Sequence, residues 1–263
     1  MLTMNSHSGA HRMLEDLHVG RDLLSPRQTD CLDNEGYLII PDFITGTMLE
    51  TLRNAYETVI RDEGIDAGKD HHQEAGARRI GNLVNKGEIW YWLWTHPIAL
   101  AAAWHVLGRD FRLGAMSGRD PLPGGGYQSY HLDCSARDNN DQPYAGFAVC
   151  IFLDEFTPSN GSTRLVPGSH RRLGMPPKEQ NEHLPGEITL VAKAGSAFFF
   201  NAHLWHAGNI NVDGSTRRLV HVYYQGRENT PWLDQRKHFR PDACRHLSTA
   251  ARRLLDVELA GEA

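Results

Sequence analysis

The pattern of hydrophobic and polar positions divides the chain into a helical first half and a strand-rich second half. Over residues 45–63 apolar residues recur at intervals of three and four, which predicts an amphipathic helix. Residues 97–108 (PIALAAAWHVLG) predict another helix, with proline at its start and glycine directly after its end. Residues 36–44 (GYLIIPDFI) predict a strand closed by a Pro-Asp turn, and the polar residues 64–80 predict a loop.

After Gly108 the pattern changes to short apolar runs separated by turn sequences such as GGG, PSNG, PG and DG. These runs have the length of strands and are rich in β-branched and aromatic residues. They are YAGFAVCIFL (144–153), STRLV (162–166), EITLV (187–191), SAFFF (196–200) and RRLVHVYY (217–224). Many short strands with turns between them predict a mainly β fold, either a sandwich or a double-sheet jelly roll, with flanking helices.

The domain organisation follows from the length of the chain and from these two patterns, helical first and strand-rich after Gly108. A chain of 263 residues can bury a sizeable core as one elaborated domain. Residues 1–24 are polar and mixed, which predicts a loosely held N-terminal arm. We therefore expect a single domain over 25–263, with a helical region at about 45–108 and a β body at about 109–240.

Composition and charge exclude several classes of protein. The formal net charge is -5 and no run of Lys or Arg stands out, which argues against a surface for nucleic acid or anionic membrane. No apolar signal core or run of about 18 apolar residues is present. The four cysteines, Cys31, Cys134, Cys150 and Cys244, form no CxxC pair, so we expect reduced thiols in a cytoplasmic protein.

Two side chains in YQSYHLDC are candidate metal ligands. His131 and Asp133 are two residues apart in an expected strand, and side chains at i and i+2 of a strand point the same way. An imidazole nitrogen and a carboxylate oxygen can therefore meet at one ion. The alternative is that they are two solvated polar residues on a strand surface.

A third ligand is predicted in NAHLWHAGNINVDGSTRR, where a strand delivers a histidine to the start of a loop. Two histidines and one carboxylate on one face of an octahedral iron leave three positions for an oxoacid and O2. Zinc usually prefers four ligands dominated by sulfur or nitrogen. Both His203 and His206 are candidates, and local spacing does not choose between them.

Arg217 stands at the start of the strand RRLVHVYY, eleven residues after His206. The far carboxylate of a dicarboxylate cosubstrate needs a planar pair of donors, which a guanidinium supplies. Alternation along the strand puts Arg217, Leu219, His221 and Tyr223 on one face. The alternative is a strand-end arginine in solvent.

Together these segments resemble the phytanoyl-CoA dioxygenase family of Fe(II)- and 2-oxoglutarate-dependent oxygenases. The resemblance extends from LSPRQTDCLDNEGYLIIPDFIT to about Arg236. Its most specific part is FLDEFTPSNGSTRLVPGSH (152–170), which matches the family's N-G-x-x-x-x-x-P-G-[ST]-H stretch. The family also has a W-H-x-x-x-x-N pattern followed by an arginine, and Trp205, His206, Asn211 and Arg217 fit that register.

The resemblance implies a double-stranded β-helix core with helices outside one sheet. It implies Fe(II) on His131, Asp133 and His206, with Arg217 binding 2-oxoglutarate, whereas His203 stands three residues too far from this arginine. Three further positions are implied near the cosubstrate: Gln128, which would need a bulge in a regular strand to face it, Thr163 and Lys86. For Lys86 the alternative is a solvated side chain, for Thr163 a hairpin residue, and His170 is expected to be structural.

The expected reaction consumes O2 and 2-oxoglutarate, releases succinate and CO2, and oxidises an unactivated C–H bond of a small metabolite. Hydroxylation is the default, and desaturation, cyclisation, epimerisation and peroxidation stay open. Halogenating relatives replace the carboxylate ligand by Gly or Ala, so Asp133 argues against halogenation. A metal-dependent hydrolase or isomerase and a ligand-binding jelly roll are the alternatives. We expect a monomer or homodimer with no nucleic-acid or membrane partner. We also expect a packed core around Trp90, Trp92 and Trp94; the alternative is that these aromatics, with the loop 64–80, line or cover a pocket.

Overall fold

The computed structural model describes residues 4–20, 22–177, 183–240 and 247–257. The helices are α1 (Met4–Asp16), α2 (Pro26–Asn34), α3 (Gly46–Glu63), α4 (Tyr91–Trp94), α5 (Pro97–Leu107), α6 (Gln235–His238) and α7 (Thr249–Leu255). The strands are β1 (Tyr37–Ile40), β2 (Ala77–Ile80), β3 (Phe111–Pro121), β4 (Gly146–Phe152), β5 (Thr163–Leu165), β6 (Ile188–Thr189), β7 (Ala197–Asn201), β8 (His206–Gly208) and β9 (Leu219–Gly226). Short 3-10 turns add η1 (Gly64–Asp66), η2 (Leu83–Asn85), η3 (Glu88–Trp90) and η4 (Ser169–Arg171).

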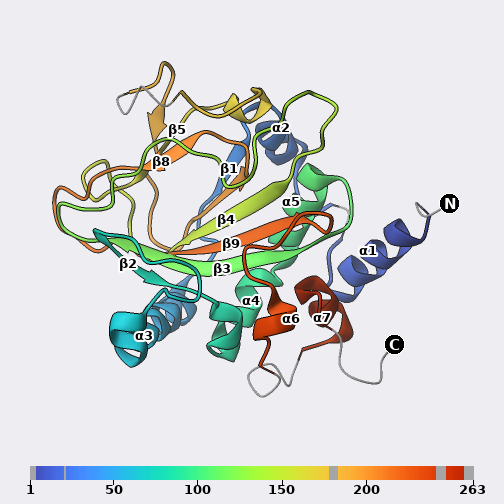
Figure 1. Ribbon diagram of the computed structural model, residues 1–263, viewed down its shortest axis with the longest axis horizontal. Coiled ribbons are helices and arrows are strands. Elements are labelled where there is room, and N and C mark those ends of the chain that lie inside the picture. The colour runs from blue at the N-terminus through green and yellow to red at the C-terminus, as the bar shows by residue number, and fades with distance from the viewer. Residues whose placement is uncertain (1–3, 21, 178–182, 241–246, 258–263) are drawn as a thin grey trace.

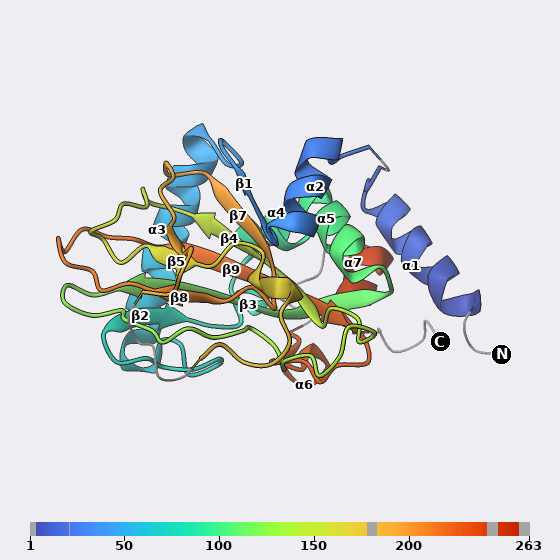
Figure 2. The same ribbon diagram turned by 90° about the horizontal axis from the view of Figure 1, so that it is seen from above.

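Two antiparallel sheets form the body of the molecule. The large sheet has the order β1-β7-β4-β9-β3-β2, and the small sheet has the order β6-β5-β8. Figure 1 shows the large sheet as a layer between helices on one side and the small sheet on the other. Figure 2, seen from above, shows the strands of the large sheet side by side, with β5 and β8 overlapping them. This arrangement confirms the expected jelly roll with flanking helices, and each face of the large sheet must bury its own set of side chains.

Alternation along the central strands supplies both cores. Phe147, Val149 and Ile151 of β4 belong to a cluster that includes residues of α3 and α5. The intervening Ala148, Cys150 and Phe152 belong to a second cluster with Leu165 of the small sheet. Near-continuous apolar runs are what a strand covered on both faces requires, so the runs singled out in the sequence correspond to buried strands.

The two predicted long helices are present with the expected ends. Helix α3 covers 46–63, and α5 has Pro97 at its first position and the left-handed Gly108 as its C-cap, with φ 62. The predicted loop over 64–80 is only partly correct, because its last residues form β2 and pair with β3. This pairing brings the loop against the large sheet.

The expectation of a loosely held arm at the N-terminus is wrong for the part of it that the structure describes. Residues 4–16 form α1, which packs against α7 near the other end of the chain. Met13, Leu14 and Leu17 are buried in the core that the helices share with the large sheet. Leu17 follows Leu14 by three residues and Met13 by four, which is helical spacing, but polar neighbours obscure it in the sequence.

Strand β3, the longest strand among the described residues, was not predicted. Its sequence FRLGAMSGRDP mixes glycines and charges with apolar residues, yet all of it is buried. Gly118 has a packing reason, since an added Cβ would lie 2.5 Å from the ring of Tyr56 on α3. Arg119 and Asp120 are buried because they have partners on other segments, and such partners cannot be read from local sequence.

The cysteines, the helices and the tryptophan cluster each bear on an expectation from the sequence. Cys31, Cys134 and Cys150 are free thiols, as expected, and Cys244 lies outside the described residues. No helix in the described ranges has the length and apolar character needed to cross a bilayer. Trp90 and Trp94 pack in the core, as expected, whereas the packed core is wrong for Trp92, which is 37% exposed, and none of the three lines the pocket described below.

Candidate metal centre and cosubstrate pocket

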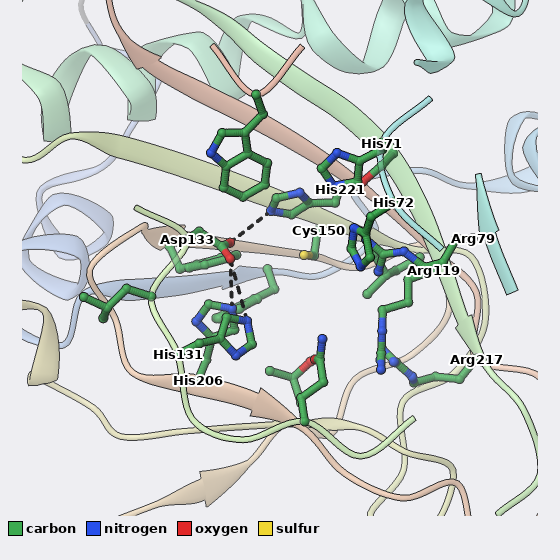
Figure 3. A pocket seen from close by; sticks show the side chains of 18 residues that line it. His71, His72, Arg79, Arg119, His131, Asp133, Cys150, His206, Arg217 and His221 are labelled. Atoms are coloured by element: carbon green, nitrogen blue, oxygen red, sulfur yellow. Dashed lines mark hydrogen bonds and ion pairs between the residues drawn. The ribbon is translucent and has the colours of Figure 1, made fainter. Parts of the chain in front are cut away.

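A pocket of about 460 Å³ opens between the two sheets. The sequence-predicted residues that line it are Gln128, His131, Asp133, Thr163, His206, Arg217, Leu219 and His221. In Figure 3, His131, Asp133 and His206 gather at one end, while Arg79, Arg119 and Arg217 gather at the other. The pocket therefore has a metal-ligating end and a cationic end.

His131 and His206 meet because the two chain segments form an isolated antiparallel bridge. The backbone N–H of His131 donates to the His206 carbonyl at 3.0 Å, and the His206 N–H donates back at 3.3 Å. The ring centroids are 4.3 Å apart. The expected regular strand through His131 is wrong, since only this single bridge forms, and His206 begins β8 rather than a loop.

Asp133 completes the cluster, and one ligand atom from each of the three residues lies within 4.8 Å of the others. Its Oδ1 is 3.7 Å from His131 Nε2 and 3.6 Å from His206 Nε2. Burial opposes ionisation, but the imidazoles of His206, His221 and His131 outweigh it and hold the pKa of Asp133 below its usual range. The carboxylate is therefore charged at neutral pH.

Both imidazoles are oriented by backbone carbonyls. His131 Nδ1 donates to the Ser129 carbonyl and His206 Nδ1 donates to the Leu204 carbonyl, each at 2.9 Å. A carbonyl only accepts, so Nδ1 carries a proton in each ring, and Nε2 is the nitrogen that faces Asp133. Burial lowers the pKa of His206 to about 4. This is the neutral tautomer that a metal ligand needs.

His203 points elsewhere. Its Nδ1 lies 3.2 Å from Asn201 Oδ1, its ring packs on Tyr144 at 5.5 Å, and it does not line the pocket. The structure thus distinguishes the two candidates that local spacing left open. The turn after β7 directs the His206 ring into the pocket and the His203 ring against Tyr144, outside the pocket. His170 is also structural, with Nε2 3.2 Å from the Asp33 carbonyl.

The family-like stretches position these groups rather than enter the pocket. Ser169 Oγ accepts the backbone N–H of Trp205 at 2.8 Å, which fixes the chain directly before His206. The Asn211 amide donates to the carbonyls of Pro121 and Ser215, and its oxygen accepts the Gly214 N–H. These bonds order the loop that connects His206 to Arg217, so the spacing between the two has a structural cause.

Arg217 is not a solvated strand end, because it is 1% exposed. Its backbone N–H donates to Asp120, and its guanidinium lies 4.5 Å above the Phe156 ring. Nε and Nη1 have no hydrogen-bond partner among the described residues. Burial and then Arg119 lower the pKa of Arg217 to about 9, so it remains a cation at neutral pH. A buried, unpaired guanidinium is costly unless an anion binds it.

The three weaker candidates differ from one another. Gln128 reaches the pocket without a bulge, because its segment is irregular, and its Oε1 accepts the Gly208 N–H at 3.1 Å. Thr163 lines the pocket from β5. Lys86 does not line it, and its ammonium is held by Glu63 and by Asp70, the latter at 2.9 Å. The position expected for Lys86 near the cosubstrate is therefore wrong.

Several lining residues were missed in the sequence: His71, His72, Arg79, Ser117, Arg119, Leu132, Cys150, Phe198, Phe200 and Trp232. Those from β2 and β3 carry no local signal, because neither strand was predicted. His71, His72 and Trp232 lie in segments without a periodic pattern of apolar residues. Only the tertiary structure brings them to the pocket.

Comparison with known proteins agrees with this geometry. The family model "Phytanoyl-CoA dioxygenase (PhyH)" matches residues 32–219, which is more than half of the 263 residues. Ectoine dioxygenase of Bordetella parapertussis is 25% identical, over 80% of this chain and 78% of its own. The Fe(II)/2-oxoglutarate-dependent dioxygenase nvfF of Aspergillus novofumigatus is 29% identical, over 59% of this chain and 53% of its own.

Among solved structures, HygX from Streptomyces hygroscopicus with nickel, 2-oxoglutarate and hygromycin B bound superposes with a TM-score of 0.66. It is 18% identical, and the match covers 79% of this chain and 90% of that one. The likeness supports the jelly-roll fold, and the family match covers the segments that carry His131, Asp133 and His206. The chain belongs to the phytanoyl-CoA dioxygenase (PhyH) family and is a dioxygenase that depends on Fe(II) and 2-oxoglutarate.

Proposed function

We propose that His131, Asp133 and His206 hold Fe(II), that Arg217 binds the far carboxylate of 2-oxoglutarate, and that the enzyme oxidises a C–H bond of a small organic metabolite. The observation that carries this proposal is the pairing of a His-Asp-His cluster with an unpaired buried guanidinium in one pocket. Hydroxylation is the proposed outcome, since Asp133 keeps a carboxylate at the position that halogenating relatives leave vacant.

The donor set fits ferrous iron. It offers two neutral imidazole nitrogens and one carboxylate oxygen, the composition of facial triads that leave positions open for O2 and an oxoacid. When bound, the iron supplies the oxidising chemistry from O2 and 2-oxoglutarate, with succinate and CO2 as coproducts. The charge of Asp133 and the fixed tautomers of both histidines are the contribution of the protein.

The cosubstrate end fits a dicarboxylate. The free Nε and Nη1 of Arg217 offer donors in the planar arrangement that a carboxylate accepts. Thr163 and Gln128 line the same pocket and carry polar groups that we propose orient the cosubstrate. Phe198, Phe200 and Leu219 supply apolar walls that exclude water and strengthen the ion pair.

The direct test is a screen of candidate metabolites for succinate formation. We expect a true substrate to stimulate succinate release that requires Fe(II), O2 and 2-oxoglutarate, with an equal amount of product heavier by one oxygen atom. Turnover of the substrate without O2 and without 2-oxoglutarate would instead support a non-redox hydrolase or isomerase on the same fold.

His203→Ala is expected to leave the Fe(II) dissociation constant within about three-fold of wild type, because its ring lies outside the pocket. It should lower the free energy of unfolding by about 1–3 kcal/mol, since a buried contact with Asn201 is lost. Metal titration and thermal melting measure the two effects. A large loss of iron affinity with an intact fold would reverse the choice between His203 and His206.

His221 is proposed to be a positioning residue for Asp133. Its Nε2 lies 3.3 Å from Oδ2, the oxygen that does not face the other imidazoles, and it is not part of the three-residue cluster. Outer-shell partners of this kind typically contribute about 10–100-fold in metal affinity. We therefore expect His221→Phe, which preserves ring stacking, to weaken Fe(II) binding by about 10-fold or more.

The control for His221 is its neighbour on the same strand face. Tyr223→Phe keeps the stacking with Trp232. Unlike His221, Tyr223 places no nitrogen beside the Asp133 carboxylate, so Fe(II) affinity should stay near wild type. His221→Gln restores a donor and should recover part of the affinity. Equal Fe(II) affinity in His221→Phe and wild type would show that this imidazole does not orient the carboxylate.

Lys86→Ala is expected to leave the 2-oxoglutarate dissociation constant within about two-fold of wild type, since Glu63 and Asp70 hold the ammonium away from the pocket. Titration of the iron-loaded protein with 2-oxoglutarate measures it. A tenfold rise would return Lys86 to the cosubstrate site.

A further inference from the structure

The β2 edge of the pocket carries two adjacent arginines. Arg79 of β2 is the register partner of Arg119 on β3, and both line the pocket. Residues directly opposite on an antiparallel pair share one face, where like charges are destabilising. Figure 3 shows both arginines on the same side of the pocket as Arg217, opposite the His-Asp-His cluster. This concentration of positive charge calls for anions.

The nearby carboxylate serves mainly one of the two. Glu74 accepts from Arg119 Nε at 2.9 Å and from Arg119 Nη2 at 2.5 Å. Its distance to Arg79 Nη1 is 3.4 Å, which is long for an ion pair with a hydrogen bond. The neutralised partner is therefore Arg119, and Arg79 has only a weak share in the same carboxylate.

Arg79 is also deeply buried. Its side chain is 9% exposed, and its Nε has no hydrogen-bond partner among the residues that the structure describes. Nη2 lies 3.5 Å from Nδ1 of His72, an imidazole whose pKa is lowered by burial and by Arg79 itself. A neutral ring does not compensate the charge, so the guanidinium is without an adequate anionic partner.

A wall of flat rings adjoins this arginine. His71 stacks on Trp232 with an interplanar angle of 17°, and Trp232 stacks on Tyr223 at 4.4 Å. Burial lowers the pKa of His71 to about 4, so this ring is neutral at pH 7. Trp232 is still 42% exposed. An apolar or planar group can therefore pack against the wall, next to one cation.

The charges of the loaded pocket leave this cation over. Fe(II) and the dianion of 2-oxoglutarate cancel, Asp133 balances Arg217, and Glu74 balances Arg119. After this count, Arg79 is the one charged residue among the described lining residues whose charge has no counterpart. A substrate with one negative charge would make the loaded pocket neutral, whereas a cationic substrate would add to an uncompensated charge of the same sign.

We propose that Arg79 binds a carboxylate of the organic substrate, whose apolar or planar body packs on the wall formed by His71 and Trp232. The substrate class is therefore a small organic monoacid. This inference rests on the proposed function, because it assigns the cosubstrate to Arg217 and leaves Arg79 for the substrate. It makes Arg79 a specificity-determining residue that sequence patterns did not indicate.

The test uses benzoate and its uncharged amide, benzamide, as matched probes. Anaerobic protein loaded with Fe(II) and saturating 2-oxoglutarate is titrated with each by calorimetry, while the visible charge-transfer band reports that the cosubstrate stays bound. A charge-assisted hydrogen bond predicts about tenfold or greater preference for benzoate in wild type. Arg79→Gln should abolish the preference, and Arg79→Lys should retain part of it.

The control is Arg61→Gln, which removes the same charge from an exposed position on α3 and should keep the preference. Equal binding of both probes to wild type, or loss of the band as benzoate binds, would overturn the proposal. So would an Arg79→Gln protein that keeps the preference or weakens 2-oxoglutarate instead. If no band forms at all, the proposed function has failed, and the same titrations of metal-free protein still decide the role of Arg79.

Discussion

Asp133→Ala is expected to weaken Fe(II) binding by more than about 100-fold, beyond the usual cost of losing an outer-shell partner. The carboxylate is the only charged member of the cluster, and its Oδ1 faces both Nε2 atoms. Without it, two neutral imidazoles remain, and metal affinity falls with ligand count and charge. His206→Ala should have a comparable effect, and either variant should abolish turnover that depends on iron. Metal titration under anaerobic conditions measures the loss.

A matched control separates this effect from general damage to the loop. Asp138→Ala removes an exposed carboxylate five residues further along the same segment, outside the pocket. It should bind Fe(II) like wild type. Wild-type affinity in Asp133→Ala, with the fold intact by circular dichroism, would remove Asp133 from the ligand set.

Arg217→Ala is expected to raise the 2-oxoglutarate dissociation constant by about 10–100-fold, the range for losing hydrogen bonds to a charged group. Iron affinity should change little, because the guanidinium lies at the other end of the pocket. Arg217→Lys keeps a charge without the planar pair of donors and should recover only part of the affinity.

The neighbouring residue provides the control. Arg218 follows Arg217 directly before β9, and its side chain binds Asp154 and Glu57 outside the pocket. Arg218→Ala should lower the free energy of unfolding by about 1–3 kcal/mol and leave the 2-oxoglutarate dissociation constant unchanged. If both variants weaken the cosubstrate equally, the effect belongs to strand packing and Arg217 is not the clamp.

Local pattern was sufficient for the elements that bury continuous apolar faces. The run around Phe147–Phe152 and the helix over 46–63 have the correct period because each residue packs close to where its pattern predicts. Strand β3 was not predicted because its buried polar residues have partners far away in the sequence. Arg119 and Asp120 are stabilised there by Glu74 and Arg78, which are distant in sequence, so polarity that indicates a loop locally is neutralised by the fold.

Candidate site residues could be predicted where they stand at a fixed interval in the sequence. Residues that reach the pocket only through tertiary packing could not. The interval between His206 and Arg217 is set by the loop that Asn211 orders, and the family resemblance used that interval to reject His203. His131 and Asp133 point toward one cluster, as predicted, although the regular strand expected to align them does not form. Arg79 and Trp232 reach the pocket through a strand and a loop that carry no recognisable motif.

The most direct measurement is anaerobic addition of Fe(II) and then 2-oxoglutarate to the purified protein, followed by visible spectroscopy. We predict a metal-to-ligand charge-transfer band that needs both additions, saturates at one equivalent per chain, and is absent from Asp133→Ala. A spectrum that stays flat in wild type after both additions, or an equally strong band in the alanine variant, would contradict a ferrous centre at His131, Asp133 and His206.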